Sequence, residues 1–258
     1  MTGVLSDVRL LAARSVRRTF RQPALVVPTI VFPLFLLAVN ASGLASATKI
    51  PGFPTSSYLD FAITVPFMQG ALFASTTAGT EIANDIETGF LNRLQLTPLR
   101  GTALLTGQMA GAVLLAFVGA LIYLAVGLIA GVSVKTGVLG VVALLAFVVL
   151  MILAFGAIGL YLAVRTGSAE QVQGLFALAL GLLFLSSMVM PRNLIKADWF
   201  KEIATYNPMS YLVEAGRSLL ITGWDGKALA LGVGISVAAF VVALTVSITS
   251  LRGRLLRT

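Results

Sequence analysis

The sequence predicts an all-α integral membrane protein, and three observations indicate this fold class. First, 58% of the 258 residues are apolar and 11% are charged, against about 45–50% and about 25% in soluble domains. Second, six apolar runs are long enough to cross a hydrocarbon core, which takes about 20 residues of helix. Third, the segments between the runs are short, so residues 1–258 are expected to form a single transmembrane domain.

An amphipathic helix is expected over residues 4–22, before the first span. Arginines at positions 14, 17, 18 and 21 lie opposite an apolar stripe on the helical wheel. This pattern is typical of a helix in the interface between membrane and water, although a solvated N-terminal helix is the alternative. The stripe consists of Leu5, Val8, Ala12, Val16 and Phe20.

None of the six predicted spans contains Asp, Glu, Lys or Arg. A cleaved signal peptide would also place arginines before an apolar run, but Pro28 and Pro33 favour a kinked permanent span. The spans cover about residues 25–44, 61–80, 102–130, 138–164, 172–190 and 228–251.

The distribution of basic residues predicts the orientation of the chain. Six spans place both termini on one side, and the positive-inside rule favours a cytoplasmic N- and C-terminus in the cell membrane. The net charge of +8 is therefore interpreted as a topology signal with contact to anionic lipid, and not as a nucleic-acid site. The inside segments would hold eleven of the 18 basic residues: Arg9, Arg14, Arg17, Arg18, Arg21, Arg93, Arg100, Arg165, Arg252, Arg254 and Arg257.

The stretch EIANDIETGFLNRLQLTPLRG, residues 81–101, concentrates charge between spans two and three. A short amphipathic helix is expected over residues 85–97, beginning at Asn84 or Asp85 and stopped by Pro98. So short a helix needs a partner surface, which could be lipid or protein. Its acidic residues disfavour anionic lipid, and this favours a groove in another protein.

The longest outside segment contains a second short helical pattern. Asn207 can cap a helix that starts at Pro208, and Glu214 with Arg217 forms an expected i,i+3 pair. A helix from Pro208 to Leu220 spans only about 20 Å, so residues 197–221 are predicted to dip in from outside and return; a helix flat on the surface is the alternative. The candidate residues are Asn207, Pro208, Tyr211, Leu212, Glu214 and Arg217.

The missing residue types exclude several chemistries. Cysteine and histidine are both absent, which removes thiolate chemistry, most metal sites and the usual general base. The sequence also lacks a G-x-x-x-x-G-K-[ST] loop, so any ATP must be handled by another chain. No catalytic residue, metal site or cofactor is therefore expected in this chain, and it is not expected to be an enzyme on its own.

The charge-free spans favour an amphipathic or lipophilic substrate, because they contain no charged side chain that could pair with a charged substrate inside the membrane. Aromatic rings, methionine and hydroxyls offer adaptable surface, although most such residues are expected to pack helices or face lipid. The candidate path residues are Phe32, Phe35, Phe67, Ser75, Thr76, Phe176, Phe184 and Met188.

At this point the chain resembles a known family. The interface helix, the six spans, the segment ETGFLNRLQLTPL and the segment NPMSYLVEAGR are similar to the ABC-2 type permeases, and more narrowly to daunorubicin-resistance-like drug exporters of actinobacteria. The resemblance covers nearly the whole chain.

The resemblance implies that residues 85–97 form the coupling helix of the permease, which docks into a separate ATP-binding subunit, and that residues 197–221 are re-entrant. Two ATPases holding ATP and Mg would drive two permeases, the second a copy of this chain or a close relative. The substrate path would run between the permeases, lined by spans one, two and five. The residues expected at the ATPase joint are Glu87, Gly89, Phe90, Leu91, Arg93, Leu94 and Pro98.

The function expected from residues and resemblance together is the permease subunit of an exporter for a drug, antibiotic or lipid, as in multidrug efflux. An ion-coupled secondary transporter is the alternative. That class needs ionisable groups near the membrane midplane and usually internal repeats, and the sequence shows neither. A membrane scaffold that transports nothing is a third reading.

Overall fold

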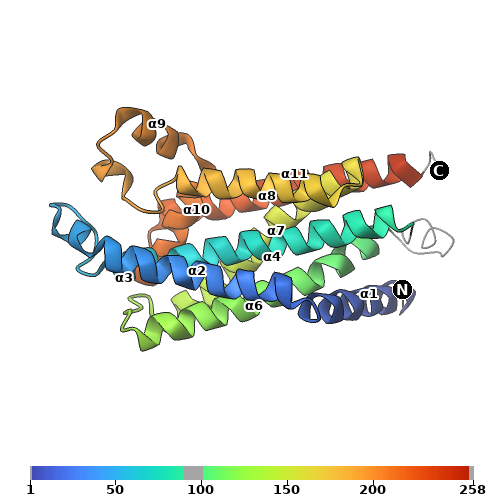
Figure 1. The fold of residues 1–258 in the computed structure, drawn as a ribbon, viewed down its shortest axis with the longest axis horizontal. Helices are drawn as coiled ribbons and strands as arrows, with labels where there is room; N and C mark the ends of the chain where they lie inside the picture. The colour runs from blue at the N-terminus through green and yellow to red at the C-terminus, as the bar shows by residue number, and fades with distance from the viewer. Residues whose placement is uncertain (1, 90–100, 256–258) are drawn as a thin grey trace.

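The computed structural model describes residues 2–89 and 101–255 and shows a long bundle of helices (Figure 1). The helix α4 (Thr64–Glu87) runs through the centre of this bundle. In its membrane-crossing window 89% of the residues are buried, against 17% in the windows of α2 (Pro23–Gly43) and α11 (Gly226–Leu255). The helices α2, α6 (Gly101–Ile129), α7 (Gly137–Thr166) and α8 (Ala169–Phe184) all pack against α4. Any movement of α4 would therefore change its contacts with four neighbouring helices.

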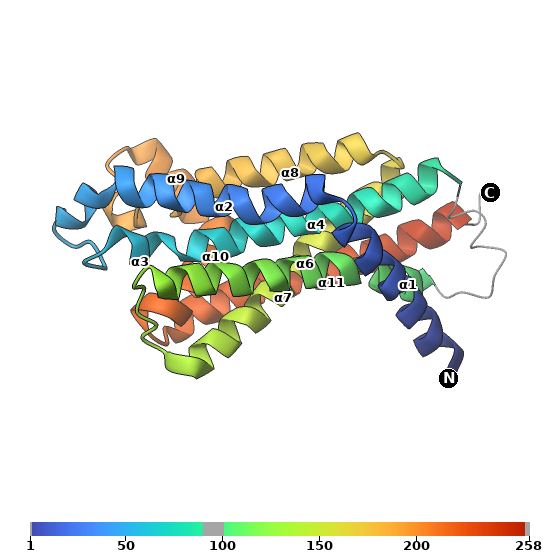
Figure 2. The same ribbon diagram turned by 60° about the horizontal axis from the view of Figure 1, so that its bottom comes forward.

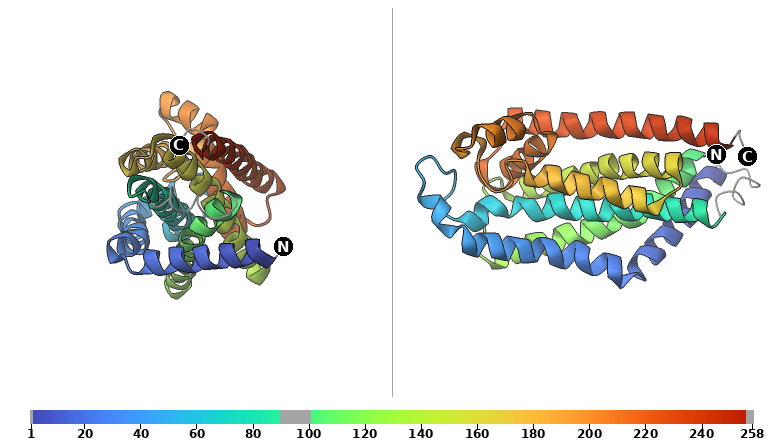
Figure 3. Two further views of the ribbon diagram at one scale, coloured as in Figure 1. Left: turned by 90° about the vertical axis from the view of Figure 1, so that its right-hand side faces the viewer. Right: turned by 45° about the horizontal axis from the view of Figure 1, so that its top comes forward.

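The remaining elements are short and lie at the two ends of the bundle. The start of α1 and the end of α11 share one end, which we name the α1 end, and α9 marks the opposite end, the α9 end (Figure 1). α1 turns away from α2 and lies across the α1 end (Figures 2 and 3). These elements are α1 (Thr2–Phe20), η1 (Ala45–Lys49), α3 (Tyr58–Ala62), η2 (Arg192–Leu194), α9 (Asp198–Tyr206), α10 (Pro208–Arg217) and the π-helical turn η3 (Ser218–Thr222).

Five of the described helical segments are long and apolar enough to cross a membrane. The fifth predicted span, 172–190, differs from the expectation, because α8 has only 16 residues and ends at Phe184. At about 1.5 Å per residue α8 is roughly 24 Å long, short of a hydrocarbon core of about 30 Å. The prediction of six full helical spans is therefore wrong for this one.

The chain after α8 nevertheless completes the pass along the bundle. At one end of α8, the backbone N–H of Ala169 donates to the carboxylate of Glu87, the last residue of α4, over 3.4 Å. At the other end, Arg217 joins the carbonyl oxygens of Ser187 and Met188 to that of Phe61, near the start of α4. α8 and the irregular residues 185–190 together thus cover the length of α4.

Small residues allow the central helices to approach closely. A Cβ atom on Gly70 of α4 would lie 2.7 Å from the ring of Tyr123 on α6, and one on Gly79 would lie 3.1 Å from the backbone of Gly159 on α7. The hydroxyl of Tyr123 donates to the carbonyl oxygen of Thr29 on α2. The backbone of α4 thus lies against the ring of Tyr123 on one side and the backbone of Gly159 on another, and Tyr123 also links α6 to α2.

The expected helix start at Asn84 or Asp85 is also wrong, because α4 continues without a break to Glu87. The helix ends at Glu87, and Gly89, two residues later, has a φ of +68° that suits the left-handed position after a helix. Of the two acidic residues that suggested a first helical turn, Asp85 is instead held by α1, and Glu87 accepts a hydrogen bond from the start of α8. Of the predicted helix 85–97, the part after Gly89 lies outside the described residues.

Candidate functional site

The α1 end of the bundle contains a buried polar contact between α1 and α4. Arg14 donates from both terminal nitrogens to the two carboxylate oxygens of Asp85, over 2.9 and 3.0 Å, and Arg18 adds a third bond of 3.1 Å. The Asp85 side chain is 5% exposed, so these charge-assisted bonds are shielded from solvent on the acidic side. The hydrogen bond with Asp85 raises the pKa of Arg14.

A second carboxylate lies one helical turn earlier on α4. Glu81 is 2% exposed and accepts hydrogen bonds from the hydroxyls of Ser15, over 3.0 Å, and Thr19, over 3.3 Å. Arg14, Ser15, Arg18 and Thr19 thus hold Glu81 and Asp85 from one face of α1. We name these six residues the α1–α4 latch.

Two glycines of α6 make room for the latch. A Cβ atom on Gly107 would lie 2.6 Å from that of Leu11, and a Cβ atom on Gly111 would lie 2.6 Å from the hydroxyl of Ser15. The backbone N–H of Gly111 donates to that same hydroxyl over 3.2 Å. α1 is therefore seated in a groove of the bundle and packs through Leu11, Ser15 and Thr19, while Ala12 and Val16 of the expected apolar stripe are half-buried and Phe20 is exposed.

An apolar groove of about 250 Å³ lies between α8 and α11, on the other side of α4. α4 and α7 form its floor, and the first turns of α10 close it toward the α9 end. The hydroxyls of Ser75, Thr76 and Ser236 face this region but donate to carbonyl oxygens of their own helices, over 2.6–2.9 Å. The groove therefore offers almost no hydrogen-bond donor to a ligand.

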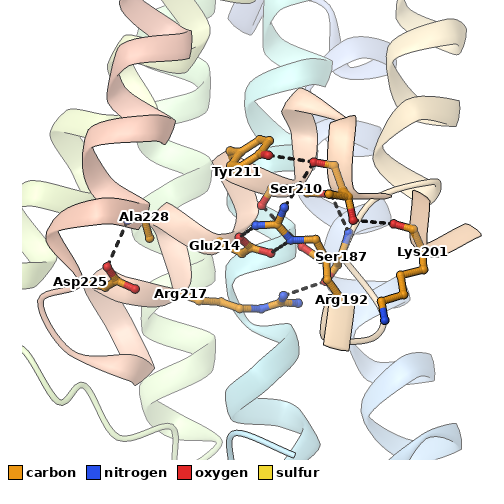
Figure 4. Close-up of polar contacts among 10 residues, drawn as sticks. Ser187, Arg192, Lys201, Ser210, Tyr211, Glu214, Arg217, Asp225 and Ala228 are labelled. Atoms are coloured by element: carbon orange, nitrogen blue, oxygen red, sulfur yellow. Dashed lines mark hydrogen bonds and ion pairs between the residues drawn. The ribbon is translucent and has the colours of Figure 1, made fainter. Parts of the chain in front are cut away.

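The α9 end holds a polar cluster that covers the unwound end of α8 (Figure 4). The amide nitrogen of Asn207 donates to the carbonyl oxygens of Leu182 and Leu185, over 2.6 and 3.0 Å, while its oxygen caps α10 by accepting from Met209. The hydroxyl of Tyr58 donates to Val189 over 2.8 Å. Carbonyl groups that a continuous helix would satisfy are bound here by side chains.

Arg217 supplies the largest share of these bonds. Its guanidinium donates to the carbonyl oxygens of Phe61, Ser187 and Met188, over 3.1, 2.7 and 2.6 Å, and lies 3.5 Å from the ring centroid of Phe61. A buried cation is thus held by backbone dipoles and a ring face.

The expected pair of Glu214 and Arg217 is wrong. Glu214 accepts two hydrogen bonds from Arg192, one of them over 2.7 Å, and Arg192 also lies 4.6 Å from the ring centroid of Tyr211 (Figure 4). A bidentate carboxylate pair is stronger than a single i,i+3 contact. The three carbonyl groups near Arg217 satisfy a guanidinium that Glu214 does not reach.

Comparison with known protein families decides the identity of the fold. Residues 6–221 match the family described as ABC-2 type transporter, and this range holds the latch, α4, the groove floor and α10. The chain belongs to the ABC-2 type transporters. It is a multi-pass membrane protein and a permease subunit, a type of chain that generally pairs with an ABC ATPase. No curated protein matches it.

The coupling residues expected in this ABC-2 permease are only partly described. Glu87 is exposed at the end of α4, next to the start of α8, and Gly89 follows in the turn. Phe90, Leu91, Arg93, Leu94 and Pro98 lie outside the described residues. The latch residues Glu81 and Asp85 therefore lie at the beginning of the stretch 81–101 that the sequence singles out.

The eight candidate path residues are spread over three places. Ser75, Thr76 and Phe176 line the apolar groove. Phe67 and Met188 are buried in the core. Exposed positions on α2 and α8 are occupied by Phe32, Phe35 and Phe184. The structure therefore brings Ser75, Thr76 and Phe176 together in one groove, and the other five candidate residues lie outside its lining.

Two buried polar side chains of α4, Thr64 and Gln69, have no hydrogen-bond partner among the described residues. Among the described residues, neither the oxygen nor the nitrogen of the Gln69 amide forms a hydrogen bond, although the side chain is fully buried. Gln69 precedes Phe73 by one helical turn, and Phe73 contacts the rings of Phe32 on α2 and Phe176 on α8, with centroid distances of 5.6 and 4.7 Å. An unpaired amide in such surroundings is costly and calls for a ligand, water or a second conformation.

Sequence reasoning missed the latch and the role of Arg192. A signal for the latch was present, because Arg14 with Arg18 and Ser15 with Thr19 are spaced by four residues, as are Glu81 with Asp85. Complementary i,i+4 pairs on two helices predict a shared face. No comparable local pattern marks Arg192, which stands in an irregular outer segment.

Proposed function

We propose that this ABC-2 permease exports an amphipathic or lipophilic compound, such as a drug, an antibiotic or a lipid. Two copies of a separate ATPase, which bind ATP and Mg, would power two permeases, the second being the same chain or a close relative. In this proposal the α1 end and both termini face the cytoplasm, and residues 85–98 form the joint with the ATPase.

The α1–α4 latch is the observation that carries the proposal. Glu81 and Asp85 fix the last turns of α4 to α1, and the expected coupling segment, residues 85–97, begins at Asp85. A force on that segment would therefore move α1 and α4 together. Because α4 packs against α2, α6, α7 and α8, such a movement would be passed to the whole bundle as a rigid-body change.

The substrate class rests on the composition and packing of the spans. The described charges of α4 lie at its α1 end, where Glu81 and Asp85 are bound by α1 and Glu87 accepts a hydrogen bond from the start of α8. Deeper in the helix, the buried amide of Gln69 has no polar partner among the described residues and lies one helical turn before Phe73, whose ring contacts Phe32 and Phe176. One polar contact within apolar surface suits an amphipathic molecule and not a strongly charged one.

The narrower assignment to daunorubicin-resistance-like exporters is part of this proposal and rests on the two sequence segments alone. The exposed row Val27, Val31, Phe35 and Val39 on α2 supports a second permease, since an apolar face of this kind can pack against another copy as well as against lipid.

A coupled assay tests the function. The permease and its ATPase are reconstituted in liposomes, and ATP hydrolysis and the export of a panel of amphipathic fluorescent dyes are measured together. We expect Phe90→Asp combined with Leu94→Asp to abolish ATP-dependent dye export while hydrolysis continues, because charges would weaken an apolar joint. Ile50→Asp, at an exposed apolar position of the α9 end, is the control. Normal export by the double variant would refute the coupling role.

A further inference from the structure

The apolar groove between α8 and α11 runs along the bundle for about half its hydrocarbon depth. On α8 its lining extends from Val172 to Leu182, which is about 15 Å at 1.5 Å per residue. One leaflet of a hydrocarbon core of about 30 Å has the same depth. The groove therefore has the length of a lipid chain within one leaflet.

The volume of the groove fits one alkyl chain better than a whole drug molecule. Its roughly 250 Å³ exceed the cavity of about 150 Å³ that binds benzene, but stay below the range of about 300–1,000 Å³ for drug-sized ligands. The hydroxyls of Ser75, Thr76 and Ser236 donate to carbonyl groups of their own helices. A ligand here gains contact surface and almost no hydrogen bonds.

The rim of the groove is continuous with the apolar surface of the bundle. Leu178 on α8 is 63% exposed at this rim, and Val233 and Val237 on α11 are exposed nearby. In a multi-pass membrane protein such surface meets acyl chains and not water. Lipid is therefore the molecule present at the opening of the groove.

We infer that this groove is a binding site for one acyl chain of a bilayer lipid, held between α8 and α11 against Phe176 and Ile158. Its lining includes Ser75, Thr76 and Phe176, which are also candidate residues of the proposed substrate path, whereas binding of a bilayer lipid depends only on insertion in the membrane. Because Phe176 also contacts Phe73 of α4, the bound chain would touch the aromatic row that joins α8 to the central helix.

A photoactivatable lipid tests this site. The protein is reconstituted with a phosphatidylcholine that carries a diazirine in the middle of one acyl chain, irradiated, and digested after Arg165, Arg192, Lys227 and Arg252. We expect adducts to concentrate on the α8 and α11 peptides, at Leu175, Leu178, Ala179, Leu182, Ile235 and Ala239.

A pair of neighbouring alanines gives a matched control. Ala239 lines the groove, whereas Ala238 is exposed beside it. Ala239→Phe should lower the adducts on α8 by roughly threefold or more, since a ring would fill much of the space, and Ala238→Phe should leave them unchanged. If Ala239→Phe fails to insert, Ala179→Phe against exposed Ala177→Phe gives the same comparison from the opposite wall.

Three results would overturn the inference. Adducts spread evenly over the exposed face of α2 and the groove would show bulk lipid only. Equal labelling in the Ala239→Phe and Ala238→Phe proteins would show that the groove is not the labelled place. A disulfide between two copies carrying Leu178→Cys, in this cysteine-free chain, would show that a second protein covers the rim instead of lipid.

Discussion

The guanidinium of Arg217 lies 2.7 Å from the carbonyl oxygen of Ser187, and this bond joins α10 to the turn that follows α8. Together with the bonds to Met188 and Phe61, it links three segments far apart in the sequence. Irregular backbone at membrane depth is tolerated only where protein groups satisfy it. Arg217 and Asn207 therefore make it possible for α8 to end after 16 residues.

Arg217→Met should destabilise the protein strongly. Three buried carbonyl groups would lose their donor at about 1–3 kcal/mol each, so we expect a loss of at least about 3 kcal/mol, and a fall in Tm of roughly 6 °C or more. The Tm of the Arg217→Lys protein should also fall, because an ammonium group cannot reproduce the planar set of donors of a guanidinium. Thermal unfolding in detergent measures both, with Lys227→Met as the exposed control. Equal Tm values for Arg217→Met and the control would contradict this role.

Gly111→Ala should loosen the α1–α4 latch. The added Cβ would lie 2.6 Å from the hydroxyl of Ser15 and 2.9 Å from its carbonyl oxygen, which forces α1 away and costs about 1–3 kcal/mol. Gly234→Ala on α11 is the matched control, since nothing lies within 4 Å of its Cβ, and it should be neutral or stabilising by about 0.5–1 kcal/mol. Unfolding and coupled export are measured for both. A stabilised Gly111→Ala protein with normal coupling would speak against the latch.

Much of the fold could be predicted from the sequence, because charge-free runs of sufficient length have few alternatives. The helices α2, α6, α7 and α11 lie within about two to four residues of the expected ranges. The end of α8 could not be predicted in this way, since residues 172–190 are uniformly poor in charge. What breaks that helix is a set of donors on Asn207 and Arg217, more than 20 residues away.

The errors at the charged residues have a common cause. Local spacing suggested that Asp85 starts a helix and that Glu214 pairs with Arg217, but both acidic residues found partners from other elements, Arg14 and Arg192. A bidentate contact between elements outweighs a weak local one. Sequence patterns therefore placed the elements of this permease better than they placed its polar contacts.

Gln69→Leu should separate stability from transport. Removing an unpartnered buried amide is expected to leave the Tm equal or higher. If the amide binds the polar part of a substrate, export of dyes with a hydrogen-bonding group should fall by roughly fivefold or more, equivalent to about 1 kcal/mol, while export of apolar dyes is kept. The initial rates of dye export in liposomes measure this. A uniform loss for all dyes would assign Gln69 to packing.

Single cysteines test the orientation of the bundle. In this cysteine-free chain, Lys227→Cys and Tyr206→Cys at the α9 end should react with an impermeant thiol reagent on intact cells, since both positions are exposed. Arg165→Cys, exposed at the end of α7, should react only in inverted vesicles. Val213→Cys on buried α10 should resist the reagent from either side. The reverse pattern would place the α1 end outside the cell.

The most direct test of the account places a photo-crosslinker at Leu91 and irradiates native membranes. The predicted result is capture of an ATP-binding subunit. This capture should be lost in the Phe90→Asp, Leu94→Asp double variant and kept in the Ile50→Asp control. It would show that the segment after the α1–α4 latch receives force from an ATPase. Capture of lipid alone, with the ATPase present in the same membranes, would contradict the account and leave the latch as a structural contact.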